Sequence, residues 1–303
     1  MIVSDHLPWI RIWPQISRKL GVFLIYDLMI SVLYVFVGVK FIAQPSLPLG
    51  MVGAALSIFL AFRTNSAYDR WWEARILWGG LVNYSRSFAR QALTLVRIPD
   101  DPDEERRVQQ RLVMLQIAFV HALRCHLRRQ NSLPELKNFL DSDTVEGLRH
   151  HRNVPAAILG KMGAELRYAY ERGWLDSYRW MSMDQSLTEL TNIQGACERI
   201  KNTPLPRQYD YFPRLLVTIF CLMLPIGLVE GLGMLTPIAS TFLGFIFVAL
   251  DSIGRNIETP FENSVHDTPM TNLSRAIEIN LRQHMGDNDN LPVEVQPVAG
   301  FMY

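Results

Sequence analysis

The stretch GMVGAALSIFLAFRTNSAYDRWWEAR, residues Gly50 to Arg75, decides how this chain is organised. Its first half, up to Phe62, has Ser57 as its one polar side chain. Its second half is rich in charged and aromatic residues. This change is typical of a membrane helix that leaves the hydrocarbon core and is anchored at the interface by aromatic and charged side chains.

Three apolar residues of this stretch, Ala54, Ile58 and Phe62, are spaced four apart. The spacing places them one above another on one face of a helix. Small residues on the other faces, such as Gly53 and Ala61, let neighbouring membrane helices approach closely. We interpret the stripe as the lining of an ion pore. From spacing alone, the alternative is the ordinary core of a helix bundle.

The composition indicates a chain that is partly in a membrane. Its 303 residues are 49% hydrophobic and 19% charged, with a net charge of +1 and a mean hydropathy of +0.08. This hydropathy predicts several spans combined with a large polar domain. The balanced charge gives no support for nucleic-acid binding. The spacing of Cys125, Cys197 and Cys221 fits neither a disulfide framework nor a zinc site.

Four apolar runs predict two membrane hairpins. They are Gly21–Ile42, Leu49–Phe62, Phe212–Met234 and Ile238–Leu250. The second run, about 14 residues long, is too short to cross a bilayer alone. It must tilt deeply within a bundle or continue as a helix into the polar sequence that follows. Pro225 is expected to interrupt the third run, and Thr236–Pro237 to form the second turn. Asp27, near the start of the first run, is expected to reach water.

The remaining sequence predicts a large helical domain. We assign residues 1–62 to an N-terminal interfacial segment and the first hairpin, 63–211 to a cytosolic helical domain, 212–250 to the second hairpin, and 251–303 to a cytosolic C-terminal segment. Helical periodicity dominates the central domain, so the predicted fold is all-α. Lys and Arg are frequent outside the hairpins and nearly absent from the two outer turns. By the positive-inside rule, both termini and the central domain are therefore expected to be cytoplasmic.

Three motifs along the chain resemble one known family. They are IFLAFRTNSAYDRWWEAR (Ile58–Arg75), GACERIKNTPLP (Gly195–Pro206) and IETPFEN (Ile257–Asn263). With the two hairpins around a helical domain, they resemble the bestrophins, most closely the bacterial inner-membrane branch, over about residues 1 to 290. The resemblance implies a homopentamer in the cell inner membrane with one central pore.

The resemblance also implies particular pore residues. The neck of the pore carries over onto Ala54, Ile58 and Phe62, and Ala54 is smaller than the aliphatic residue usual in the family. A second, cytosolic constriction carries over onto Tyr178, with Arg179 next to it. Apolar rings can gate by dewetting but cannot coordinate an ion.

The family's eukaryotic members carry a calcium clasp after a Pro-Phe pair. Here Pro260 and Phe261 are present, but the acidic run is reduced to Glu262 and Asp267. Calcium requires several oxygen ligands, usually from several carboxylates. We therefore expect no calcium gating at this segment, no metal site and no cofactor.

The implied function is a channel for small monovalent ions. The family includes anion channels, which set the default expectation of chloride, and bacterial members that pass monovalent cations such as sodium. A non-conducting membrane scaffold is a further alternative. A membrane enzyme would need a polar catalytic cluster, and the sequence contains no P-loop, nucleophile elbow or dinucleotide fingerprint.

Two further positions have competing interpretations. Glu230, near the far end of the third run, is either an acidic ring at the outer pore mouth or an exposed interfacial residue, because a buried acid in a membrane is costly. His121 and Cys125, four apart, have the spacing of metal ligands. Arg124 and Arg128 lie beside them and no carboxylate is expected nearby, which favours an ordinary packed or solvated helix.

Overall fold

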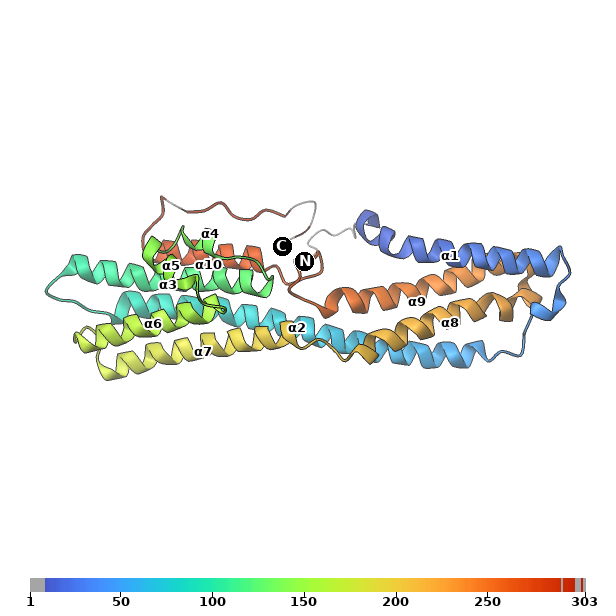
Figure 1. Cartoon of the computed structure of the whole chain (residues 1–303), viewed down its shortest axis with the longest axis horizontal. Helices are drawn as coiled ribbons and strands as arrows, with labels where there is room; N and C mark the ends of the chain where they lie inside the picture. The colour runs from blue at the N-terminus through green and yellow to red at the C-terminus, as the bar shows by residue number, and fades with distance from the viewer. Residues whose placement is uncertain (1–8, 290, 298–300, 302–303) are drawn as a thin grey trace. The chain divides into compact units, whose positions relative to one another are not determined.

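The computed structural model describes residues 9–289, 291–297 and 301, and every regular element within them is a helix (Figure 1). In chain order these are α1 (Trp9–Val35), η1 (Lys40–Ile42), α2 (Leu49–Leu95), α3 (Pro102–Leu127), α4 (Leu133–Leu136), α5 (Ser142–Leu148), α6 (Val154–Glu171), α7 (Ser177–Asn202), α8 (Arg207–Leu232), η2 (Gly233–Leu235), α9 (Thr236–Glu258) and α10 (Met270–His284). The predicted all-α fold is confirmed.

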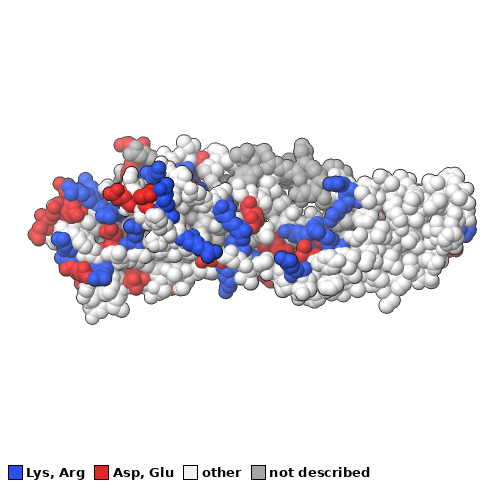
Figure 2. All heavy atoms as spheres, viewed as in Figure 1, with Lys and Arg blue, Asp and Glu red and all other residues white. Residues whose placement is uncertain are grey.

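The chain folds as two compact units. The described residues up to Trp71, together with Pro204–Thr259, form what we call the apolar unit. Trp72–Thr203 and the described residues from Pro260 onward form the polar unit. The borders lie beyond the predicted ends of the hairpins, because the helices continue past the apolar runs. On the face shown in Figure 2, charged side chains are dense over the polar unit and sparse over most of the apolar unit.

Helix α2 settles how the short second run is accommodated. It continues without a break for 47 residues, which corresponds to about 70 Å. A hydrocarbon core is about 30 Å thick, so this helix extends far beyond one. The alternative in which the run continues as a helix is therefore confirmed. Among the residues that the structure describes, two segments are long and apolar enough to cross a membrane: α2 itself, and the run from Arg207 to Glu258 that contains α8, η2 and α9.

The second hairpin differs from its predicted form. Helix α8 runs through Pro225 rather than stopping there. The turn is η2, where Gly233 has a φ of +53°, a conformation that glycine adopts without a Cβ clash. Thr236 and Pro237 therefore begin α9 instead of forming the turn, as Pro readily occupies the first turn of a helix.

The apolar unit has one small core between its helices. Leu56 and Leu60 of α2 pack there with Val217 and Phe220 of α8. At Gly53 a Cβ atom would lie 3.2 Å from Cζ of Phe220, so the missing side chain lets this ring lie against α2. Close approach through small residues is the usual way in which membrane helices associate.

Asp27 of α1 was expected to reach water, and this prediction is wrong. Its side chain is buried, with a residue exposure of 1%. The reason is that α1 packs along α9, which places the hydroxyls of Ser240 and Thr241 within hydrogen-bond distance of its carboxyl group.

The polar unit is organised around α3. This helix begins at Pro102, where the Asp101 side chain caps it by accepting a hydrogen bond from the backbone N–H of Glu104 at 3.0 Å. It then packs against α6, α7 and α10. Its inward residues, among them Phe119 and Leu123, are fully buried.

A charged network lies within this packing at His121. Nδ1 of His121 is 2.8 Å from Oε1 of Glu135, and Nε2 is 3.1 Å from Oε2 of Glu278. Arg124 pairs with Glu135, and Arg275 pairs with Glu278 at 3.0 Å. The network therefore joins α3 to the start of α4 and to α10.

The expectation that His121 and Cys125 have no carboxylate nearby is wrong, because folding brings Glu135 and Glu278 to them. The packed-helix interpretation holds, since both residues are buried. Within the described part of the chain, no group of three or more His, Cys, Asp or Glu side chains has a metal-binding arrangement. Burial by itself raises the pKa of Glu135, but the hydrogen bond from His121 and the charges of Arg124 and His121 outweigh it and lower the pKa to about 2.

The low pKa of Glu135 predicts acid sensitivity of the polar unit. Because the folded pKa lies below the ordinary value of 4.5, the stabilisation by this carboxylate is present above pH 4.5 and is lost as the pH falls towards 2. It amounts to on the order of 2–3 kcal/mol. Glu135→Gln should therefore be destabilised at neutral pH and lose less stability on acidification, as measured by urea unfolding of the purified protein across this range.

Glu146→Gln is the matched control. Glu146 forms an exposed pair with Arg149 at 2.9 Å, and such pairs contribute little. Its pH profile should follow that of the wild type. Parallel profiles for the wild type and Glu135→Gln would contradict the assignment of the stabilisation to Glu135.

Candidate pore site

The predicted stripe lies on an exposed face of α2. Ile58 is 59% exposed and Phe62 is 66% exposed, which is unusual for such large apolar side chains. Ala54 is exposed as well. Leu60, on the opposite face, is only 2% exposed and belongs to the core. The side chains of the stripe are therefore not part of the core formed within the chain.

Directly after Phe62, the chain places a buried charge. Arg63 is 1% exposed, because one residue along a helix turns the side chain by about 100° and so from the outer face towards the bundle. Its Nη1 atom donates to Oδ1 of Asp251 at 2.6 Å, and its Nη2 atom donates to Oδ1 of Asp210 at 2.6 Å. Oε2 of Glu258 lies 3.7 Å from Nη2.

We call Arg63, Asp210, Asp251 and Glu258 the Arg63 cluster. It connects α2 to α8 through Asp210, and to α9 through Asp251 and Glu258. A second guanidinium, that of Arg255, pairs with Asp251 at 3.0 Å. These contacts determine the rotation of α2 about its axis at this level, and with it the direction in which the stripe faces.

Sequence reasoning missed this cluster, although a signal was present. Arg63 follows the second apolar run, Asp210 precedes the third, and Asp251 follows the fourth. In two antiparallel hairpins these three positions fall at the same end of the bundle. Charges of opposite sign at one end of several membrane helices are expected to pair, because each is costly when it is buried alone.

The predicted cytosolic constriction lies in the first turn of α7. Tyr178 is strongly exposed, at 84%. Arg179 pairs with Asp176 at 3.1 Å and donates from Nη1 to the backbone O of Leu95 at 3.3 Å. Asp176 in turn caps α7 by accepting from the backbone N–H of Arg179. These two residues belong to the polar unit, whereas the stripe belongs to the apolar unit.

Glu230 lies in the last turn of α8 and is exposed. Because the Glu230 side chain is exposed, the free-energy cost of burying an acid in a membrane does not arise from packing within this chain. Its position next to η2 is compatible with both interpretations, an acidic ring at a pore mouth and an interfacial side chain.

The segment after Phe261 uses its two acids for contacts within the protein. Glu262 pairs with Nζ of Lys201 at 2.7 Å. Asp267 is buried and accepts a hydrogen bond from the Ser264 hydroxyl. Burial raises the pKa of Asp267, in spite of the opposing hydrogen bonds from Ser264. Each carboxylate therefore already interacts with another side chain of the protein, and a bound cation would have to displace that interaction.

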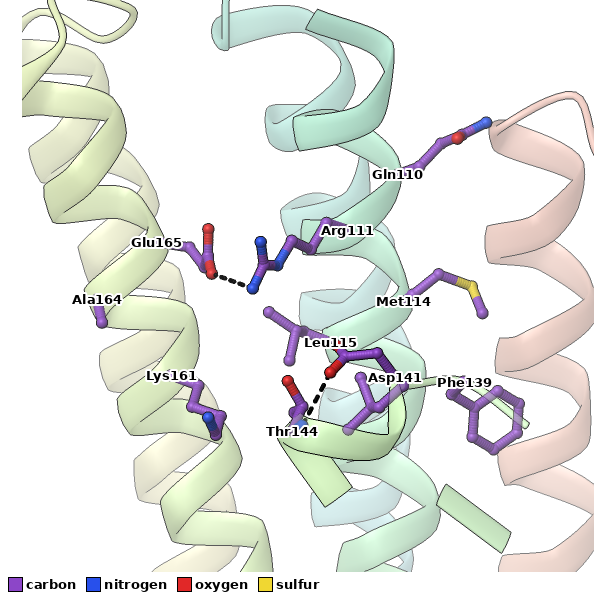
Figure 3. A pocket seen from close by; sticks show the side chains of 11 residues that line it. Gln110, Arg111, Met114, Leu115, Phe139, Asp141, Thr144, Lys161, Ala164 and Glu165 are labelled. Carbon is purple, nitrogen blue, oxygen red and sulfur yellow. Dashed lines mark hydrogen bonds and ion pairs between the residues drawn. The ribbon is translucent and has the colours of Figure 1, made fainter. Parts of the chain in front are cut away.

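The polar unit contains a cavity of about 550 Å³ (Figure 3). It is lined by residues of α3, the α4–α5 region and α6. Arg111 pairs there with Glu165 at 3.1 Å, and Asp141 caps α5 by accepting from the backbone N–H of Thr144 at 2.8 Å. Both carboxylates therefore have partners that hold the structure together, Glu165 between α3 and α6 and Asp141 at the start of α5.

Comparisons with known proteins point to one family. A family model described as "Bacterial/Fungal Bestrophin protein" matches residues 10–283. A protein of Ralstonia nicotianae named "Voltage-dependent anion channel-forming protein RSc3414" is 36% identical over 295 residues, which cover 95% of each chain. The Salmonella typhi protein "Voltage-dependent anion channel-forming protein YneE" is also 36% identical, over 98% of each chain.

The fold has experimentally determined counterparts. The crystal structure of a bacterial bestrophin homologue from Klebsiella pneumoniae matches with a TM-score of 0.84 and 29% sequence identity, over 90% of this chain and 99% of that chain. Family model, relatives and structure agree over nearly the whole length, and the chain is therefore a member of the bacterial bestrophin family.

Proposed function

We propose that this chain is the subunit of a homopentameric channel for small anions, with its pore lined by Ala54, Ile58 and Phe62. The observation that carries the proposal is the stripe itself. Two large apolar side chains are exposed on a helix whose opposite face forms the core. In a family with relatives named as anion channel-forming proteins, a symmetric pore is the environment that best accounts for such a face.

In this proposal the stripe acts as a hydrophobic neck. Five copies of Ile58 and five of Phe62 form rings from which water can retreat, and the neck conducts when it is wet. The smaller Ala54 makes the third ring wider. The Arg63 cluster lies one residue beyond Phe62 and positions the rings without lining them, because its guanidinium is buried and paired.

The cytosolic aperture and the topology are further parts of this proposal. We place the cytosolic aperture at Tyr178 and Arg179, since Tyr178 projects freely from the start of α7. We place four spans as two hairpins in the inner membrane, with both termini and the polar unit in the cytoplasm, because Lys and Arg concentrate outside the hairpins.

A channel for monovalent cations such as sodium is the second candidate. Glu230 favours it, because an exposed acid at the end of α8 would be repeated five times at a pore mouth and would attract cations. The names of the relatives favour anions instead.

The ion that permeates is tested by flux into liposomes that contain the purified protein. One gradient pairs chloride with an impermeant cation, and the other pairs sodium with an impermeant anion. We expect flux with the chloride gradient and a pentamer by native mass spectrometry. Flux with the sodium gradient alone would establish the cation channel, and an intact pentamer without either flux would support the scaffold.

Truncation of the neck should increase conduction. Ile58→Ala or Phe62→Ala removes apolar surface from the rings, so water stays in the constriction and flux per pentamer should rise severalfold. The matched control is Leu60→Ala, on the buried face of the same helix. This change removes core contacts, costs about 2–5 kcal/mol and should lower the yield of pentamer without a gain in flux. Reduced flux from a dissociating Ile58→Ala protein would place the pore axis elsewhere.

Calcium should have no effect on conduction. Two separated acids with protein partners, Glu262 and Asp267, offer too few free oxygen ligands. We expect equal flux in micromolar calcium and in chelator, measured in the same liposomes. A calcium response that Asp267→Ala abolishes would contradict this expectation and assign a clasp to the segment.

A further inference from the structure

Asp27 is a buried carboxyl group within the apolar unit that the proposed channel mechanism does not use. It lies in α1, with a residue exposure of 1%, and it faces hydroxyl groups of α9. Its Oδ2 atom is 2.6 Å from Oγ of Ser240 and 3.0 Å from Oγ1 of Thr241. Its Oδ1 atom is buried and, among the residues that the structure describes, has no hydrogen-bond partner.

The Ser240 hydroxyl has a single hydrogen, and this restricts the protonation state of Asp27. Oγ of Ser240 is also 2.7 Å from the backbone O of Thr236, so it makes two short contacts to oxygen atoms. A serine hydroxyl has one hydrogen to donate, and neither a carbonyl nor a carboxylate oxygen has any. If the hydroxyl donates to the carbonyl, as serines within helices commonly do, the short contact with Asp27 requires a hydrogen on Oδ2.

The neutral acid satisfies every contact in this group. Oδ2–H of Asp27 donates to Oγ of Ser240, Oγ–H of Ser240 donates to the backbone O of Thr236, and the Thr241 hydroxyl donates to Oδ2. Oδ1 is then a carbonyl oxygen, for which a missing partner costs much less than it does for an oxygen that shares a negative charge.

In the described part of the chain, no Lys or Arg side chain pairs with Asp27 to stabilise its ionised form. The titratable groups near Asp27 are the Tyr26 hydroxyl on α1 itself and the Cys221 thiol of α8, and α9 presents only hydroxyls to it. Asp251 makes the contrast clear. It is buried to a similar degree in the same unit, yet it pairs with two guanidinium groups, those of Arg63 and Arg255.

We propose that Asp27, Ser240 and Thr236 form a proton-binding site within the membrane-spanning part of the protein. The bound proton neutralises the carboxyl group and completes a hydrogen-bond chain that joins α1 to α9. Release of the proton leaves an unpaired charge at this contact, which is costly away from water. The strength of the contact between α1 and α9 thus depends on pH.

The test compares the full-length protein with Asp27→Asn, which keeps the shape, the neutrality and a donor towards Ser240. The infrared spectrum of wild-type protein at neutral pH should contain a protonated-carboxyl C=O stretching band that Asp27→Asn lacks. Asp27→Asn should unfold at the wild-type temperature at neutral pH. At alkaline pH the unfolding temperature of the wild type should fall below that of Asp27→Asn.

Asp251→Asn is the matched control, because it removes an ionised buried carboxylate. It should lower the unfolding temperature at neutral pH and leave the carboxyl band in place. Should Asp27→Asn fail to fold, Ser240→Ala gives the same information, since loss of the hydroxyl acceptor should shift the band of Asp27 without removing it.

Two results would overturn the proposal. One is the absence of a carboxyl band that depends on Asp27 or Ser240. The other is a rise in the unfolding temperature with sodium, at constant ionic strength, in the wild type and not in Asp27→Asn, which would assign the site to a metal cation. None of these readouts requires ion flux, so the outcome is independent of the proposed channel activity.

Discussion

The ion pairs of Arg63 are the contacts on which the arrangement of the apolar unit depends. A guanidinium group that is 1% exposed loses its hydration, and this cost is offset only when its hydrogen bonds to carboxylates are short and well directed. Two contacts of 2.6 Å, to Asp210 and Asp251, meet this condition. Since the three residues come from α2, α8 and α9, a change in the rotation or height of any of these helices would separate a buried charge from its partner. The cluster therefore determines the packing of the helices more than it adds to their net stability.

The orientation of α2 gives the proposed pore its surface. Along this helix, Leu56 and Leu60 enter the core while Ile58 and Phe62 remain outside, so one apolar run serves two different environments. A core residue is held by contacts within the chain. The stripe has none of comparable extent, and its apolar character has to be explained by lipid, by neighbouring subunits or by a pore. A neck lined only by hydrocarbon needs rigid support, because its width decides whether water stays, and the buried charges next to it are well placed to provide that rigidity.

Asp27 and Asp251 show two ways in which the same unit accommodates a buried acid. Asp251 lies at the end where the chain supplies guanidinium groups, and it is stabilised as an ion. Asp27 lies in α1, and the groups of α9 that contact its carboxyl group are the hydroxyls of Ser240 and Thr241. Hydroxyls can share a proton with a carboxyl group but cannot neutralise a charge. The difference arises from the neighbours and not from the residue type, since both side chains are aspartates of similar burial.

The all-helical class, the apolar runs and the four-residue spacing of Ala54, Ile58 and Phe62 could be predicted from the sequence, because periodicity and composition are local properties of single segments. The family followed from the resemblance of three motifs. The side of α2 that forms the core became visible only in the folded protein, since a helix with apolar residues on several faces does not specify the face that meets its neighbours. The burial of Asp27 and the carboxylates around His121 could not be predicted either, and for the Arg63 cluster the sequence indicated only that charges of opposite sign lie at one end of the bundle. Each joins residues that are separated in the chain, by up to 214 positions for Asp27 and Thr241. Such contacts depend on the relative rotation and register of packed helices, and these are set by the fit of many side chains at once.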